Sequence, residues 1–285
     1  MKGAIVINDL KADPLTKEFI RDDEIFADLV NGLLFEGRET VLVEDIREGD
    51  TDSSAYIDDR TVERRGDITK TVRVHGKEIV VRIENQQKPD KRMAVRNGEY
   101  TMLHYDKQIK GKRKVLPVYT FSLYYGEGEW RYPIRIRDMV EIPEEIIGKF
   151  QDWDARVVDM KKVNPKLFRN KELRAFLEAL QRLYGWNKKL ESLEGMILTR
   201  RAALLLGVVS GTKDLVEKVL NHQGGTVDMC KAVDEALKER EAIGTQKGII
   251  NVLKNIMVNL DVNANEAMNI AGVKEEDRER YILLL

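Results

Sequence analysis

The sequence contains almost none of the features that mark secreted and membrane proteins. Its 285 residues include one cysteine, Cys230, so an intramolecular disulfide cannot form and a reducing compartment is favoured. No stretch approaches the roughly 20 consecutive apolar residues of a transmembrane helix, and the first apolar run is too short for a signal peptide. We therefore expect a cytoplasmic protein without a membrane partner.

Histidine, proline and glycine-rich loops are also scarce. The chain has three histidines, and it lacks a glycine-rich loop of the kind that cradles nucleotide phosphates. These absences argue against most metabolic or regulatory α/β enzymes, a class kept as a second alternative. The last of the six prolines is Pro165, so only glycine can interrupt helical patterns beyond it.

Charge is balanced over the whole chain but not along it. The net charge is −1, so no overall field attracts nucleic acid. Residues 1–60 carry sixteen acidic and seven basic side chains, whereas residues 82–114 carry ten basic and four acidic ones. Such a basic segment can contact phosphates although the chain is neutral, and a solvated charged face is the plain alternative.

The first half of the chain alternates helical and strand patterns. Apolar residues recur at helical spacing over residues 22–37, with Asp22 or Asp23 as the N-cap and Gly37 as the stop. The expected elements that follow are a short strand from Thr40, a polar loop at 47–60, a hairpin at 65–88, a helix at 91–109 and a buried strand at 114–126.

The second half is predicted to be helical from about Val163 to the end. An amphipathic helix stops at Gly185, and further helical stretches cover residues 188–209, 212–222, 227–243, 246–260 and 264–284. The shift in composition predicts an α/β part at 1–150 and a helical accessory region at 151–285. The apolar stripes of this region need a partner, either neighbouring helices, the α/β part or a second copy, so a homodimer is left open.

The hairpin carries polar residues at its open end. A turn at His75 and Gly76 pairs residues whose numbers sum to 151, which sets Asp67 directly opposite Glu84. Because side chains alternate between faces, Gln86 shares their face. A shift of one residue would mismatch the apolar face of the hairpin, so this register is the one that we expect.

Two opposed carboxylates need a positive charge between them. Asp67 and Glu84 would lie about 5 Å apart and repel each other, and a divalent cation held by their oxygens is the simplest resolution. The alternative is an ordinary solvated face whose carboxylates pair with Arg73 or Arg82. The hairpin alone leaves both interpretations open.

The helix that follows the hairpin presents cationic side chains. Arg92, Arg96 and Tyr100 are spaced i, i+4 and i+8, and Lys107 or Gln108 continues the stripe. Guanidinium groups suit phosphate oxygens, and tyrosine can donate a hydrogen bond or stack on a base. A solvent-facing arginine stripe is the common alternative, but a carboxylate pair followed directly by such a helix favours a phosphate-binding site.

Five stretches carry a resemblance to a known family. They are "DDEIFADLVNGLLFEG" at 22–37, "RRGD" at 64–67, "IENQ" at 83–86, "MAVRNGEYTMLHYDKQI" at 93–109 and "LPVYTFSLYYGEGEW" at 116–130. With the order of elements, they make the chain resemble the PD-(D/E)XK nuclease superfamily and, within it, the recombination-promoting nuclease or "putative transposase" family. The family's Met-x-x-Arg and later aromatic and amide positions appear as Met93, Arg96, Tyr100, Tyr105 and Gln108.

The resemblance implies a restriction-endonuclease-like core, a mixed sheet flanked by helices, followed by an all-α region. It makes Asp67 and Glu84 the ligands of Mg²⁺ or another divalent cation. Gln86 stands where the superfamily has lysine, and its amide can position water but supplies no charge. Because Glu-x-Gln is the form that this family usually shows, the departure does not imply inactivity.

The same resemblance suggests further contributors and a substrate. Asp28 and Asn31 match the family's pattern on the first helix, where Glu24 shares their face. Arg96, helped by Arg92, would bind DNA phosphate. The implied function is a metal-dependent DNA endonuclease of recombination or mobile elements, although the sequence shows no three-carboxylate transposase signature. The main alternative is a non-catalytic module that binds nucleic acid or protein.

Overall fold

The computed structural model describes residues 11–49, 52–57, 60–65, 68–112 and 114–285. It forms two compact units, Met1–Cys230 and Lys231–Leu285, which are considered separately. The predicted boundary at residue 150 does not coincide with this division. The assignment of residues 1–150 to the nuclease-like part and 151–285 to an accessory part stays a prediction.

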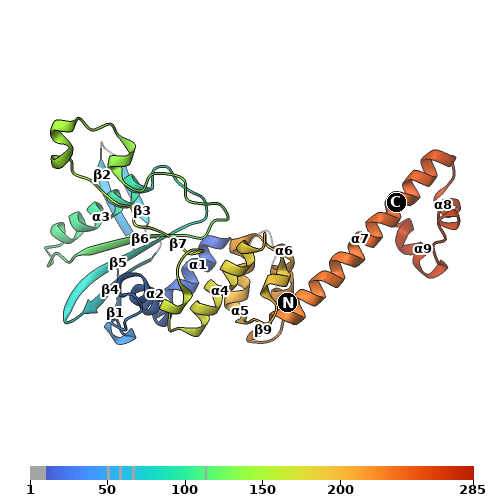
Figure 1. The fold of residues 1–285 in the computed structure, drawn as a ribbon, viewed down its shortest axis with the longest axis horizontal. Helices are drawn as coiled ribbons and strands as arrows, with labels where there is room; N and C mark the ends of the chain where they lie inside the picture. Colours follow the sequence, from blue (N-terminus) through green and yellow to red (C-terminus); the bar gives the residue numbers. More distant parts are fainter. Residues whose placement is uncertain (1–10, 50–51, 58–59, 66–67, 113) are drawn as a thin grey trace. The chain divides into compact units, whose positions relative to one another are not determined.

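A five-stranded mixed sheet forms the centre of the first unit (Figure 1). Its strand order is β1-β4-β5-β6-β7, with β5 in the middle. The first three strands pair antiparallel, and β5, β6 and β7 run parallel. The strands span Ile46–Glu48 (β1), Ile68–Val74 (β4), Lys77–Gln86 (β5), Val118–Tyr124 (β6) and Val157–Asp159 (β7).

The structure confirms the predicted register of the β4–β5 hairpin. The pairs run from Ile68–Ile83 to Val74–Lys77, so paired residue numbers sum to 151. His75 and Gly76 form the turn with φ of 47° and 77°, the two positive values that a type I′ turn requires. Asp67 lies outside the described residues, so its position opposite Glu84 stays a prediction.

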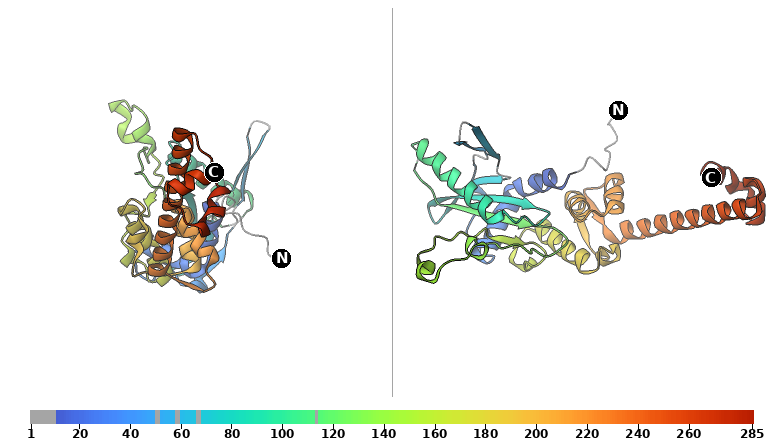
Figure 2. Two further views of the ribbon diagram at one scale, coloured as in Figure 1. Left: turned by 90° about the vertical axis from the view of Figure 1, so that its right-hand side faces the viewer. Right: turned by 90° about the horizontal axis from the view of Figure 1, so that it is seen from above.

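Helices cover the two faces of the sheet (Figures 1 and 2). One face of the hairpin presents Ile68, Val72 and Ile83 toward α1 (Ala12–Arg21) and α2 (Asp23–Phe35), whose N-cap is the predicted Asp22. Lys70 is buried on this face, where Asp23 and the carbonyl of Arg21 bind its ammonium group. The opposite face is covered by α3 (Met93–Lys110), which follows β5 and leads into β6 as predicted.

Two segments before the hairpin differ from expectation. The predicted loop at 47–60 is wrong, because β2 (Asp52–Ile57) and β3 (Arg60–Arg65) form a two-stranded antiparallel ribbon. The backbone N–H and C=O groups of such a ribbon form hydrogen bonds between its two strands, so the ribbon can form without alternating apolar and polar residues. The strand expected from Thr40 begins only at Ile46, because Asn31 binds the backbone groups of Thr40 and Val41 that a strand would use.

The predicted helical half contains two short strands and packs on the first helices. After β7 come α4 (Lys171–Gly185), α5 (Arg200–Ser210) and α6 (Lys213–Asn221), while β8 (Ile197–Thr199) pairs with β9 (Thr226–Asp228). The prediction of an all-helical region at 151–285 is therefore wrong at these two strands and at β7, which is the fifth strand of the central sheet. Phe176 of α4 lies 5.4 Å from Phe19 of α1 between ring centroids, so the apolar stripe of α4 packs against the helical layer beneath the sheet.

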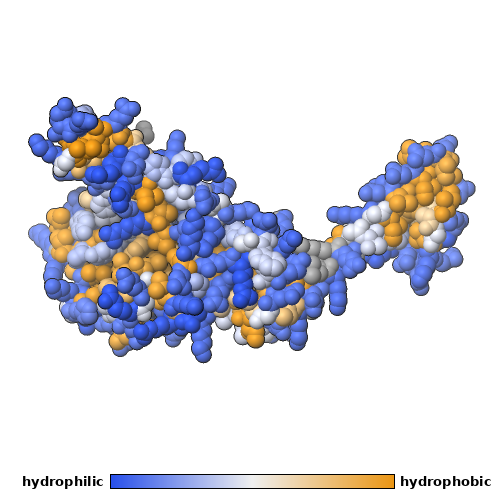
Figure 3. Space-filling model, in the orientation of Figure 1, coloured by the Kyte–Doolittle hydropathy of each residue, from blue (hydrophilic) through white to orange (hydrophobic). Residues whose placement is uncertain are grey.

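The second unit has a small core of its own. It consists of most of α7 (Met229–Leu260) with α8 (Ala264–Ile270) and α9 (Glu275–Ile282), around Leu253, Ala267, Met268 and Tyr281. The two helices predicted at 227–243 and 246–260 are one continuous helix. The helical stretch predicted at 264–284 is instead divided into α8 and α9, with Gly272 at a φ of 69° between them. Figure 3 shows apolar residues at the surface of this unit. Two of its apolar side chains, Val258 and Leu283, are more than 80% exposed.

The packing of α2 against the segment before α4 generates a stability prediction. A Cβ atom at Gly32 would lie 2.3 Å from Cε1 of the buried Phe168 ring. Gly32→Ala should therefore lower the free energy of unfolding by about 1–3 kcal/mol, although alanine normally favours a helix. Gly185→Ala is the matched control, because nothing lies within 4 Å of its added Cβ. Urea unfolding in which Gly32→Ala matches or exceeds wild type would contradict this packing.

Candidate functional site

Glu84 lies at the centre of the sheet and is 3% exposed. It belongs to β5, the middle strand, and pairs with Ser122 of β6 on the face that α3 covers. The amide of Asn97 on α3 donates a hydrogen bond to the Ser122 hydroxyl at 3.3 Å. The contact of α3 with β6 thus keeps the carboxylate of Glu84 away from bulk water.

Arg82 supplies a buried positive charge beside this carboxylate. Its guanidinium is fully buried, and Nη2 lies 3.6 Å from Oε1 of Glu84. Nη1 donates a hydrogen bond to the Tyr100 carbonyl at 3.4 Å, and Cζ lies 5.5 Å from the Tyr100 ring centroid. Because an ionised carboxylate is costly to bury alone, Arg82 and Glu84 stabilise each other on this face. The sequence had offered Arg82 only as an alternative partner of the carboxylates.

Tyr100 separates Arg82 from a second guanidinium. Arg96 lies one helical turn before Tyr100 on α3, with its Cζ 5.8 Å from the ring centroid and its Nη2 3.4 Å from the hydroxyl. Its Nη1 donates to Asp90 at 2.6 Å. These contacts form a chain of alternating groups from Glu84 to Asp90 along the underside of α3. The spacing of Arg96 and Tyr100, which the sequence analysis interpreted as part of a phosphate-binding stripe, brings these two side chains into contact with each other.

The Arg96–Asp90 pair keeps both of its members charged. Burial alone would lower the pKa of Arg96, but its hydrogen bonds to Asp90 and Tyr100 raise that pKa above its ordinary value. Partial burial alone would raise the pKa of Asp90, but the Arg92 backbone N–H and the Arg96 guanidinium lower it instead. Arg92, at the N-cap of α3, and Lys107, near the other end of the predicted stripe, are exposed, whereas Arg96 is half-buried and Tyr100 is buried.

Gln86 is the last residue of β5 and is half-buried. In the parallel part of the sheet it aligns with Tyr124 of β6, which aligns in turn with Asp159 of β7. Its carbonyl accepts a hydrogen bond from the Tyr125 N–H at 2.9 Å, which extends the pairing of β5 with β6 by one residue. Gln86 and Glu84 share a face because they are two residues apart on one strand, as predicted.

The structure gives Asp28 and Asn31 contacts with the backbone of neighbouring segments. The carboxylate of Asp28 accepts hydrogen bonds from the N–H groups of Arg169 and Asn170, both at 2.9 Å, directly before α4. Asn31 binds both N–H and carbonyl groups of the segment that leads to β1. These contacts fix the positions of α4 and β1 on α2. A contribution of either side chain to metal binding stays a prediction.

Two residues of the family-like pattern have a similar structural role. The hydroxyl of Tyr105 accepts a hydrogen bond from the N–H of Val118 at 3.0 Å, and the Gln108 side chain both accepts from and donates to the backbone of Leu116. They hold the start of β6 against α3. The pattern on α3 therefore combines charged groups near Glu84 with amide and phenol groups that position the next strand.

Of the two carboxylates in the predicted metal site, Glu84 belongs to the residues that the structure describes. Within that part of the chain, no group of three or more histidine, cysteine, aspartate or glutamate side chains could hold a metal ion. Asp67, the second predicted ligand, lies outside it. Hence Asp67 as a ligand, and its pairing with Glu84 at one metal, stay predictions.

Removing Arg82 should leave Glu84 as an uncompensated buried charge. We expect Arg82→Leu to lower the free energy of unfolding by about 3–5 kcal/mol, and the double variant Arg82→Leu/Glu84→Gln to recover part of that loss. The matched control is Arg47→Leu, which removes an exposed arginine 3.3 Å from Glu78 and should cost about 0–1 kcal/mol. Equal losses for Arg82→Leu and Arg47→Leu in chemical denaturation would contradict the buried pair.

The comparisons with known proteins agree with the resemblance at the level of the family. No match was found among curated proteins or among solved structures. No described helix is long and apolar enough to cross a membrane. The model of the family described as "Putative transposase, YhgA-like" matches residues 11–203, which is more than half of the chain and includes the sheet, α3 and the helices through α4. The chain therefore belongs to the YhgA-like "putative transposase" family.

Proposed function

We propose that the chain is a metal-dependent DNA endonuclease with a PD-(D/E)XK core, acting in recombination or in mobile elements. The observation that supports this most strongly is the buried Glu84 on the central strand, in the confirmed register that leads toward Asp67. The order helix, strand, hairpin, helix, strand agrees with the expected core. Membership of a family named for transposition fits a DNA substrate.

The side chains on this face fit a magnesium ion in their chemistry. Mg²⁺ prefers oxygen ligands and binds proteins through one or two carboxylates while it keeps several waters. Glu84 would provide one carboxylate and Asp67 the other, and Arg82 would hold Glu84 in place from the buried side. When bound, the ion would supply Lewis-acid stabilisation and a more acidic water.

The remaining residues would position the substrate and the attacking water. The Gln86 amide, on the face of Glu84, would orient a water toward the phosphorus of a phosphodiester bond. Arg96 would bind a phosphate oxygen by exchanging its pairing with Asp90 for the phosphate, and the exposed Arg92 would bind a neighbouring phosphate. Tyr100 would keep the guanidinium of Arg96 in its orientation through the hydroxyl contact.

A non-catalytic nucleic-acid-binding module is the second candidate. The observation in its favour is Gln86, which supplies no positive charge at the position where the superfamily has lysine. The charge of Arg82 is fully buried and comes two residues before Glu84 on β5, whereas Gln86 comes two residues after it. Metal-dependent cutting separates the two candidates.

Loss of either predicted metal ligand should abolish cleavage. We expect purified wild-type protein to nick or linearise supercoiled plasmid with Mg²⁺ and to leave it intact in EDTA. Glu84→Ala and Asp67→Ala should each lose this activity, because one carboxylate alone would hold the ion weakly. Glu129→Gln, at an exposed carboxylate 2.9 Å from Lys162, should cut at the wild-type rate. Cleavage by folded Glu84→Ala at that rate would remove the site assignment.

The side chain at position 86 should set the rate of cleavage, but cleavage should not require glutamine there. Gln86→Lys should retain metal-dependent cutting, since lysine restores the charge of the wider superfamily. Gln86→Leu should reduce the single-turnover cleavage rate by about 100-fold, because it removes the dipole that orients the water. The DNA affinity in EDTA should be the same for both variants and wild type. If Gln86→Leu cuts as fast as wild type, the side chain serves packing alone.

A further inference from the structure

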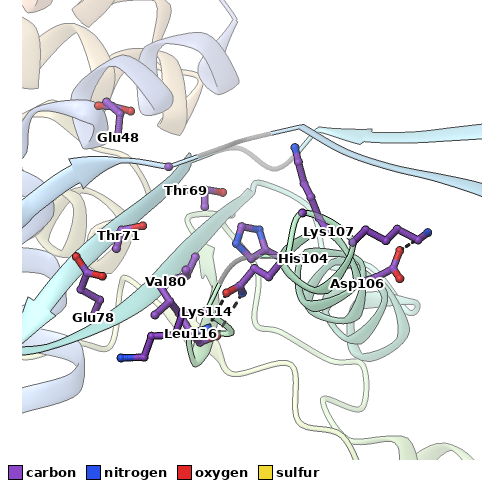
Figure 4. A pocket seen from close by; sticks show the side chains of 14 residues that line it. Glu48, Thr69, Thr71, Glu78, Val80, His104, Asp106, Lys107, Lys114 and Leu116 are labelled. Atoms are coloured by element: carbon purple, nitrogen blue, oxygen red, sulfur yellow. Dashed lines mark hydrogen bonds and ion pairs between the residues drawn. The ribbon is translucent and has the colours of Figure 1, made fainter.

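The recess beside the C-terminal end of α3 has a lining whose charges balance (Figure 4). Apart from one histidine, its titratable side chains are three carboxylates and three lysines: Glu48, Glu78, Asp106, Lys107, Lys110 and Lys114. Charge therefore favours no class of ligand there. A second recess, of about 370 Å³, lies between α3, the first residues of β6 and the segment before β7, and it differs in its aromatic lining.

Three aromatic side chains line this second recess, which we call the aromatic recess. They are Tyr105 of α3, Tyr119 of β6 and Trp153 of the segment before β7. All three are half-buried, so each ring is held by the protein and still presents part of its surface. A hollow lined by several rings suits a flat aromatic ligand, because aromatic rings attract one another in stacked and edge-to-face arrangements.

Neighbouring groups fix two of these rings. The indole N–H of Trp153 donates to the side-chain oxygen of the buried Asn97 at 3.4 Å, and a Cβ atom at Gly98 would lie 3.3 Å from Cδ1 of the indole. The hydroxyl of Tyr105 accepts a hydrogen bond from the N–H of Val118 at 3.0 Å. The aromatic recess is therefore preorganised, which lowers the entropy cost of binding a ring.

The two carboxylates in the lining are paired with arginines that lie outside it. Asp152 is 2.7 Å from Arg137, and Asp154 is 3.6 Å from Arg135. Each carboxylate also accepts hydrogen bonds from backbone N–H groups. Both acids thus serve the local structure, and their charges are compensated without any cation of the lining itself.

Arg156 is the remaining charged group of the lining. Its guanidinium is 5.2 Å from the centroid of the Tyr119 ring, and the residue is exposed. Among the residues that the structure describes, this guanidinium has neither an ion-pair partner nor a hydrogen-bond acceptor. An arginine that stacks on a ring still presents its planar fork of N–H donors, which matches the oxygens of a phosphate.

We propose that the aromatic recess binds an unpaired base of a DNA strand, with the adjacent phosphate at Arg156. Bases of any sequence stack on aromatic side chains, and arginine adds a contact to the backbone. In a duplex the faces of each base are covered by its neighbours, so the recess selects single-stranded or unpaired DNA. The proposal rests on the proposed function for its DNA substrate, and a free nucleotide would present the same ring and phosphate.

A buried amide connects the aromatic recess with the candidate site. Asn97 accepts the hydrogen bond from Trp153 and donates one to the hydroxyl of Ser122 at 3.3 Å. Ser122 aligns with Glu84 across the sheet. Thr120, which lines the recess, precedes Ser122 by two residues, or about 7 Å along β6. The recess and the candidate site are therefore close enough for one strand to contact both.

Binding of short strands in EDTA tests the aromatic recess in the full-length protein. Fluorescence anisotropy would compare a labelled 12-nucleotide oligodeoxythymidine, a strand of the same length without bases, and a blunt duplex. We expect Tyr119→Leu to weaken binding of the oligodeoxythymidine about 10-fold, because it removes the ring, and Tyr119→Phe to bind it as wild type does. Neither substitution should change binding of the strand without bases or of the duplex.

A second substitution tests the phosphate contact. Arg156→Gln should weaken binding of both single strands and reduce the slope of log K against log salt by about 0.7, the value for one phosphate of a single strand. Trp186→Leu and Arg182→Gln are the matched controls, because both side chains are exposed and neither lines the recess. Both controls should bind every strand as wild type does.

The outcomes separate the two sources of the base and the two proposals. Displacement of the oligodeoxythymidine by deoxythymidine monophosphate, lost in Tyr119→Leu, would show that the recess takes a free nucleotide, and no displacement would assign it to a strand. Unchanged binding by folded Tyr119→Leu, or an equal loss with the strand without bases or in Trp186→Leu, would overturn the proposal. A protein that binds in this way but never cuts plasmid contradicts only the endonuclease, because the binding assay contains no metal.

Discussion

The burial of the Glu84 carboxylate against the Arg82 guanidinium is the constraint on which the centre of this fold depends. The carboxylate of Glu84 is 3% exposed and the guanidinium of Arg82 is fully buried, so their opposite charges compensate each other, and Arg82 also contacts Tyr100 on α3. The position of α3 on the sheet is thereby linked to the charge on β5. A purely structural sheet gains little from such a pair, since apolar residues of similar size stabilise a core at least as well. In the proposed endonuclease the pair would have a functional reason, because the metal would need a carboxylate at this place.

On the face of the sheet opposite α3, α2 connects the hairpin to the segments before α4 and before β1. Asp28 and Asn31 on α2 bind backbone groups before α4 and before β1, and Phe168 packs on Gly32. Helices α1 and α2 also cover the apolar face of the hairpin. The strand that carries Glu84 therefore packs on helices that are themselves bound to the segments before α4 and before β1. The family match through residue 203 includes α4, which agrees with this packing.

Local patterns predicted the elements whose structure depends on local chemistry. The turn at His75 and Gly76 fixed the hairpin register, and capping by Asp22 with apolar spacing fixed α2. The ribbon β2–β3 and the late start of β1 could not be predicted in this way, because the first depends on cross-strand pairing and the second on a side chain ten residues away. Two helices were predicted on either side of Gly244, but α7 continues through this glycine. A Cβ atom added at Gly244 would meet nothing within 4 Å, so close packing does not require glycine there.

The candidate site shows the same division. Alternation along β5 placed Glu84 and Gln86 on one face, but no pattern showed that α3 would bury Arg82 beside Glu84 or that Arg96 would pair with Asp90. These contacts arise from the packing of α3 across the sheet, which sequence spacing does not encode.

The most direct test of the central claim is the position of a divalent cation in a crystal of the full-length protein soaked with Mn²⁺. Anomalous difference density should show one ion within coordination distance of the carboxylates of Glu84 and Asp67, and this peak should be absent from Glu84→Ala crystals. An ion bound elsewhere, or no ion at Glu84 at a Mn²⁺ concentration that supports plasmid cleavage, would contradict the assignment of this face as the catalytic site.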